Sequence, residues 1–120
     1  MNTKQLFKTV AEHLLNQQQQ SENGGLCMYR GPYGNKCAVG CLISDEVYTT
    51  KLEGLATGAE RVVKAINTSL NDVLTESDID LLVELQTIHD NDLVEDWEVR
   101  LDNLSNKMFE APLYTILQEN

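Results

Sequence analysis

Apolar residues recur every three or four positions along most of the chain, which is the spacing of helices that bury one face. The first such stripe covers residues 6–15, and Asn2 with Gln5 stands before it in the arrangement of a capping box. This pattern predicts a helix that ends near Gln20. The polar, glycine-containing stretch from Ser21 to Gly25 predicts a loop after it.

Two further stripes predict helices in the middle of the chain. Thr57 and Glu60 are spaced as a capping box, so we expect one helix to begin there. Thr75 or Ser77 is expected to cap the next helix, whose apolar positions run as far as His89.

A fourth helix is predicted after Asp92 and Glu95, which form another capping pair. Its apolar residues alternate at spacings of three and four and form a narrow seam, which fits either a neighbouring helix or a second copy in a homodimer. Pro112 ends the pattern, and the apolar tail 113–117 fits a short strand or a docked extension. The seam consists of Val94, Trp97, Leu101, Leu104 and Met108.

The run from Cys27 to Ile43 separates the first helix from the rest. Its glycines and proline predict a turn between two short segments, hence a β-hairpin around residues 27–38. After the turn, Cys37 to Ser44 has the spacing of the first turns of a buried helix. The expected fold is therefore mainly α (α+β), a single compact domain over residues 1–120 with four to five helices and a small hairpin.

Length and composition agree with one modest core. The chain has 120 residues, no apolar run near the ~20 residues that span a bilayer, and no basic, apolar start of the signal-peptide kind. We therefore expect a cytoplasmic protein without membrane contact. The three cysteines are an odd number and are expected to be reduced thiols.

The charge is concentrated in one segment. Residues 71–102 hold eleven acids and one base, Arg100, so this segment accounts for the whole net charge of −10. Such a surface repels nucleic acid and anionic membranes, and we expect no direct binding of nucleic acid. It can imitate DNA toward a basic protein, or it can be a solvated face that keeps the protein soluble. The candidate partner-binding acids are Asp92, Glu95, Asp96 and Glu98.

Cys37 is the candidate nucleophile. At a helix start beside Lys36, both the helix dipole and the neighbouring cation would favour its thiolate. With His89 as base and Asp90 as the residue that orients it, Cys37 could serve a cysteine-dependent hydrolase or transferase. The alternative is that Cys37 and His89 are ordinary core residues.

The cysteines also allow a metal site in principle. Cys27, Cys37, Cys41 and His89 make a complete Cys3His set in number. Their spacing lacks a CxxC knuckle, so we assign no metal and no cofactor.

The turn itself is cationic and suits an anion. Arg30, Lys36 and the backbone amides from Gly31 to Gly34 could receive a phosphate or carboxylate, with Tyr29 and His89 alongside. The alternative is that Arg30 pairs with the acidic helices and ties the hairpin to them.

Two strings resemble segments of small proteins from phages and bacterial genomes. The first is CxYRGPxGxKCAVGxLI, which begins at Cys27 and ends at Ile43, and the second is LQxxHD from Leu85 to Asp90, followed by Trp97. No activity is assigned to those proteins. The resemblance implies a phage or mobile-element setting. Taken with the charge and the cationic turn, it leads us to expect an accessory, counter-defence protein that inhibits or modulates a host protein or sequesters a small anionic ligand.

Overall fold

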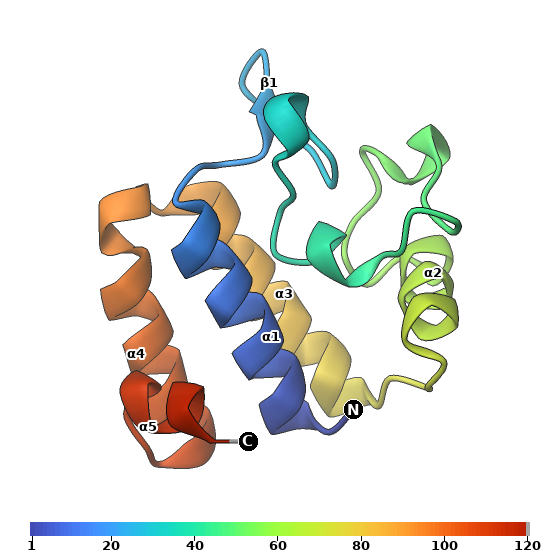
Figure 1. Ribbon diagram of the computed structural model, residues 1–120. Coiled ribbons are helices and arrows are strands. Elements are labelled where there is room, and N and C mark those ends of the chain that lie inside the picture. Colours follow the sequence, from blue (N-terminus) through green and yellow to red (C-terminus); the bar gives the residue numbers. More distant parts are fainter. Residues whose placement is uncertain (120) are drawn as a thin grey trace.

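The computed structural model describes residues 1–119 and has the predicted fold class, mainly helical with one small antiparallel hairpin (Figure 1). The hairpin pairs β1 (Glu22–Asn23) with β2 (Leu26–Cys27). The helices are α1 (Thr3–Gln17), α2 (Glu60–Leu70), α3 (Glu76–Asn91), α4 (Trp97–Phe109) and α5 (Leu113–Gln118). Four short 3-10 turns complete the described secondary structure: η1 (Pro32–Gly34), η2 (Gly40–Leu42), η3 (Thr50–Leu52) and η4 (Val94–Asp96).

Helices α1, α3 and α4 form the main bundle, and α5 closes its lower end in Figure 1. Trp97, Leu101 and Leu104 of the predicted seam are buried in this bundle. Most of the seam therefore packs inside the chain, although Met108 at its end is 36% exposed. The tail is a docked helix, because Leu113 and Ile116 of α5 are buried. No helix within residues 1–119 is both long enough and apolar enough to cross a membrane.

Two of the predicted helix starts are confirmed. Asn2 and Gln5 form a capping box on α1, and Thr75 forms one with Asp78 on α3. The other two are wrong. Helix α2 begins at Glu60 itself, so the N-cap position falls on Ala59, which has no side-chain acceptor, and not on Thr57.

The fourth predicted cap is displaced because Asp92 already ends α3. A 3-10 turn, η4, follows, and α4 begins only at Trp97. The indole Nε1 of Trp97 donates a hydrogen bond to the carbonyl of Asp92, which holds the two helices together at this corner.

The hairpin lies earlier than predicted. Its strands are at residues 22–27, and the predicted turn is closed by one isolated antiparallel bridge between Arg30 and Lys36. The predicted helix after Cys37 is only the 3-10 turn η2. Gly40 begins that turn directly against the backbone of Tyr29, where a Cβ atom would lie 2.0 Å from the Tyr29 carbonyl oxygen.

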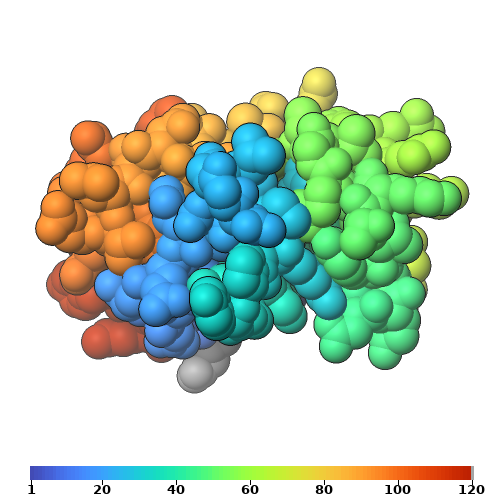
Figure 2. Space-filling view, turned by 90° about the horizontal axis from the view of Figure 1, so that it is seen from above, coloured from blue at the N-terminus to red at the C-terminus, as the bar shows by residue number. Residues whose placement is uncertain are grey.

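The hairpin and the loop after it project from one end of the bundle. Seen from that end, residues 20–40 lie between the α3–α4 corner on one side and the segment around residues 45–60 on the other (Figure 2). This end of the molecule gathers most of the residues singled out in the sequence.

Candidate functional site

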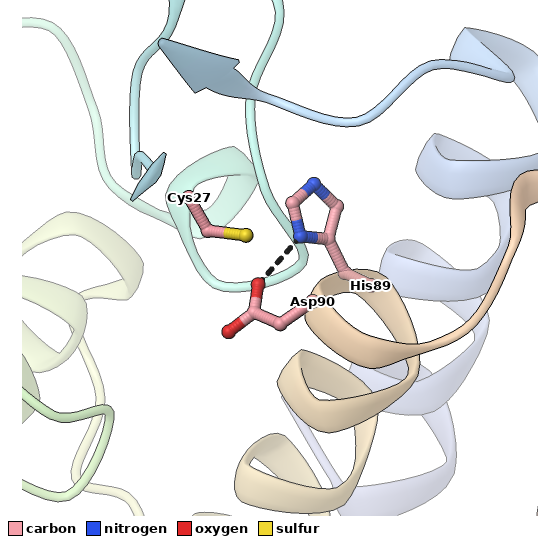
Figure 3. A group of neighbouring side chains, drawn as sticks. All are labelled: Cys27, His89 and Asp90. Carbon is pink, nitrogen blue, oxygen red and sulfur yellow. Dashed lines mark hydrogen bonds and ion pairs between the residues drawn. The ribbon is translucent and has the colours of Figure 1, made fainter. Parts of the chain in front are cut away.

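Three polar side chains meet where β2 faces the end of α3. The thiol of Cys27, the ring of His89 and the carboxylate of Asp90 have ligand atoms within 4.8 Å of one another (Figure 3). Cys27 comes from the hairpin, and the other two are adjacent residues in the last turn of α3. The contact therefore joins two segments that are far apart in the sequence.

Hydrogen bonds occupy both ring nitrogens of His89. The backbone N–H of Ser21 donates to Nε2 at 2.9 Å, and Nδ1 lies 2.7 Å from Oδ1 of Asp90. Because Nε2 accepts a hydrogen bond, the ring proton is on Nδ1 and is donated to Asp90. The ring is fully buried and stacks at a tilt on Trp97, with 5.6 Å between ring centroids.

Asp90 receives a second hydrogen bond from its own helix. The amide nitrogen of Gln86, one turn earlier, donates to Oδ1 at 2.7 Å, while the amide oxygen of Gln86 accepts from the backbone N–H of Val39. Burial favours the neutral acid, but hydrogen bonds from His89, Gln86 and Cys27 outweigh it and hold the pKa of Asp90 below its ordinary value. The carboxylate is therefore ionised and rigidly held.

Asp90 lines a cavity of about 330 Å³, which we call the Asp90 cavity. Its walls come from the segment after the hairpin, from the loop between η3 and α2, and from α3. The residues that line it are Cys27, Met28, Tyr29, Cys37, Gly54, Leu55, Ala56, Thr57, Gln86 and Asp90.

Of the two roles that the sequence left open for Cys37, reactive thiol or core residue, the packing favours the second. Its side chain is 1% exposed, and its Sγ accepts a hydrogen bond from the backbone N–H of Gly40 at 3.2 Å. Burial raises the pKa of Cys37 to about 12, although that hydrogen bond lowers it in part. No regular helix begins at Cys37, so the helix dipole expected to favour its thiolate is missing, and the core-residue alternative fits better.

The proposed catalytic trio forms only in part. Asp90 does orient His89 through Nδ1, as the sequence suggested. In a cysteine relay, however, the thiol would bond to Nε2, and the backbone N–H of Ser21 holds that position here. His89 is therefore a core histidine with both nitrogens in use.

The predicted Cys3His set does not assemble in the described part of the chain. The thiol of Cys41 donates to the carbonyl of Ala38, and neither Cys41 nor Cys37 joins the group formed by Cys27, His89 and Asp90. That group is also a poor metal site, because the atom that His89 presents to it is the protonated Nδ1.

Arg30 is held by the loop that follows it. Its guanidinium pairs with Asp45 at 2.7 Å, donates to the carbonyl of Ile43 at 2.8 Å and lies over the ring of Tyr48. The expected pairing of Arg30 with the acidic helices is wrong, because Asp45 is close in sequence and takes that role. Arg30 thus ties the turn to residues 43–48.

A carboxylate of the chain itself binds the amides just before the turn that was expected to bind an anion. Glu53 accepts from the backbone N–H groups of Tyr29 and Arg30, at 2.8 and 3.1 Å, and within the turn the N–H of Gly31 donates to the carbonyl of Asn35. Lys36 places its carbonyl against α1, where His13 and Gln17 contact it. The ligand-binding set predicted from the turn is therefore used mainly for internal structure.

Gly31 and Gly34 allow the backbone conformation of the turn. A Cβ atom on Gly31 would lie 2.8 Å from the hydroxyl of Ser21, and Gly34 has a φ of +76°. Between them Tyr33 also has a positive φ, 62°, and is 98% exposed. The tip of the turn is a projecting tyrosine rather than a cradle for a ligand.

Three acids in η4 and the first turn of α4 form what we call the acidic edge: Glu95, Asp96 and Glu98. All three are exposed, and within residues 1–119 none of them forms an ion pair. Asp92 differs from them, because it is partly buried and lies 3.7 Å from Arg100. Of the four predicted partner-binding acids, three are therefore free to contact another molecule.

Sequence reasoning missed Ser21, Glu53 and Gln86. Ser21 and Glu53 act on residues 68 and 24 positions away, and no local pattern indicates such contacts. Gln86 could have been found, since residues four apart on a helix face each other and Gln86 precedes Asp90 by four.

Comparison with family models, with curated proteins and with solved structures gave no match.

Proposed function

We propose that this chain is a small acidic accessory protein of phage type that binds a host protein in the cytoplasm. It inhibits or modulates that protein by binding and catalyses no reaction. The observation that carries the proposal is the acidic edge, where three exposed carboxylates find no cation among residues 1–119.

The edge also offers apolar surface. Leu93 and Val99, which flank the three acids in sequence, are 64% and 61% exposed. Protein interfaces combine complementary charge with apolar contacts, whereas a face that only keeps a protein in solution needs no exposed leucine. The partner surface that fits is basic with apolar positions between the charges.

The site chemistry weighs against the alternative, a cysteine-dependent hydrolase or transferase. Cys37 is buried with a raised pKa, and His89 has no free nitrogen to accept a proton. A binding protein needs neither group to be reactive.

The test uses the immobilised full chain to capture a host protein, which is then identified and purified for calorimetry. The variant Glu95→Gln/Asp96→Asn/Glu98→Gln removes the charge of the acidic edge with little change in shape. We expect its Kd for the purified partner to rise at least about tenfold, as when several complementary charges are lost.

The matched control is Glu46→Gln/Glu60→Gln/Glu110→Gln, which removes the same charge from three exposed acids elsewhere. Its Kd should stay close to that of the unmodified protein. Equal weakening by both variants would show that only total charge matters and would overturn the assignment to the acidic edge.

A further inference from the structure

The Asp90 cavity contains one charge and no counter-charge. Burial raises the pKa of Cys27 to about 11 and those of Tyr29 and Cys37 to about 12, so these groups are neutral at pH 7. Asp90 is ionised, and in the described chain no lysine or arginine lies within ion-pair distance of it. The cavity is therefore negatively charged.

The carboxylate of Asp90 has neutral donors but no cationic partner. His89 and Gln86 both donate to Oδ1, and the thiol of Cys27 gives the carboxylate a further, weaker hydrogen bond, but no lysine or arginine of residues 1–119 pairs with it. Figure 3 shows the second oxygen turned away from the His89 ring. The ionised Asp90 side chain is 33% exposed, so a ligand can reach it, and a donor that also carries positive charge compensates such a carboxylate best.

We propose that the Asp90 cavity is a binding site for a primary ammonium group. Oδ1 already has two donors, so the carboxylate cannot offer both oxygens to the planar fork of a guanidinium. An ammonium is a compact charge that can use Oδ2 alone. Thr57 lines the cavity as well, and its hydroxyl is a further acceptor.

The size of the cavity limits the ligand. About 330 Å³ is at the small end of the range of ligand pockets, so a short alkylamine or the end of a lysine side chain fits, and the negative charge of Asp90 disfavours an anionic ligand such as a nucleotide. This inference goes beyond the proposed function, since the Asp90 cavity and the acidic edge share no residue.

The test is an NMR titration of the full, isotope-labelled chain with n-butylamine at pH 7. We expect amide shifts in the residues that line the cavity, and at least about tenfold weaker binding to Asp90→Asn, which keeps the shape and the Oδ1 acceptor. The control Asp80→Asn removes an exposed acid from the same helix and should bind as the unmodified protein does. Equal affinity of Asp90→Asn, or shifts mapped to the acidic edge, would overturn the proposal.

Ala56→Phe provides an independent variant that leaves the hydrogen bonds of Asp90 untouched. Ala56 is exposed and lines the cavity, so a bulky ring there should block entry and weaken binding of n-butylamine. Unchanged binding by a folded Ala56→Phe protein would contradict the location of the site.

Three further probes test the chemistry. n-Butanol should not bind, and n-butylguanidinium should bind more weakly than n-butylamine; the reverse order overturns the choice of ammonium. Stoichiometric zinc binding that displaces n-butylamine would show a metal site instead and would also overturn it.

Nα-acetyl-lysine N-methylamide separates the two sources of an ammonium. Binding of this compound supports a lysine side chain as the natural ligand, and its exclusion, with n-butylamine still bound, supports a free amine. The neutralised acidic-edge variant should bind n-butylamine normally, so failure of this proposal is distinguishable from failure of the proposed function.

Discussion

Gly40 is the residue with the least room for change. Its Cα faces the backbone of Tyr29 so closely that an added Cβ would lie 2.0 Å from the carbonyl oxygen. We expect Gly40→Ala to lower the free energy of unfolding by about 2–3 kcal/mol, because backbone rather than a flexible side chain must move. Urea unfolding measures this.

Gly58→Ala is the matched control for that prediction. The nearest atom to its added Cβ would be a methyl carbon of Ile79 at 3.9 Å, an ordinary contact. A loss from Gly58→Ala as large as the loss from Gly40→Ala would contradict the steric explanation.

Asp78 and Asp90 make the fold sensitive to acid. Hydrogen bonds outweigh burial at both carboxylates and lower the pKa of each below the ordinary 3.8. Their ionised forms stabilise the fold fully above that ordinary value, and the stabilisation is lost as pH falls through the lowered folded pKa. The free energy of unfolding should therefore fall between pH 5 and pH 3.

Urea titrations at pH 7, 5 and 3 test the acid sensitivity. Asp90→Asn should be less stable than the unmodified protein at pH 7 and should lose less stability between pH 5 and 3. The same loss in this variant as in the unmodified protein would show that Asp90 does not contribute to it.

At the level of single residues, the sequence allowed prediction only of short-range contacts. It suggested that Asp90 orients its neighbour His89, and the structure has that hydrogen bond. It also placed Cys37 at a helix start beside a cation, but the reactivity of a cysteine depends on burial, which tertiary packing decides. The donor that occupies His89 Nε2 comes from Ser21, 68 residues away.

The capping-box pattern predicted some helix starts correctly and others not. Asn2 and Thr75 lie in exposed positions, where a side chain is free to cap its own helix, and both capping boxes form. Thr57 has the same spacing from a glutamate but is drawn into the wall of the Asp90 cavity. Contacts with later residues also hold the segment where the hairpin was predicted. Glu53 accepts a hydrogen bond from the backbone N–H of Tyr29, and Asp45 pairs with the guanidinium of Arg30.

Thr75 and Ser77 give a direct test of the cap on α3. The hydroxyl of Thr75 accepts from the backbone N–H of Asp78, so Thr75→Ala should cost about 1 kcal/mol of unfolding free energy. Ser77→Ala, inside the helix and exposed, should cost much less. Equal costs in urea unfolding would mean that the capping box does not stabilise the helix.

For the whole molecule, the uneven distribution of charge is the property that could be predicted directly from the sequence. All net charge lies in residues 71–102, and the structure divides those acids into two groups. Some are used internally: Asp72 pairs with the N-terminal amine, Asp78 caps α3, and Glu84 pairs with Lys107. The acids of the acidic edge have no such role, which only the folded arrangement could reveal.

Binding through the acidic edge should depend on salt. Exposed charges are screened over about 8 Å at physiological ionic strength and over still shorter distances above it. We expect the Kd for the captured host protein to rise steadily between 50 and 500 mM NaCl, with a smaller rise for the acidic-edge variant. Calorimetry over this range measures both, and parallel curves would exclude the edge as the charged contact.

The most direct test of the account compares Cys37→Ser with the acidic-edge variant in binding to the same purified host protein. Serine keeps an acceptor for the Gly40 N–H. We expect Cys37→Ser to retain the affinity and the inhibitory or modulating effect of the unmodified protein, whereas the acidic-edge variant should lose both. Loss of the effect in a folded Cys37→Ser protein, with the acidic-edge variant fully active, would contradict it.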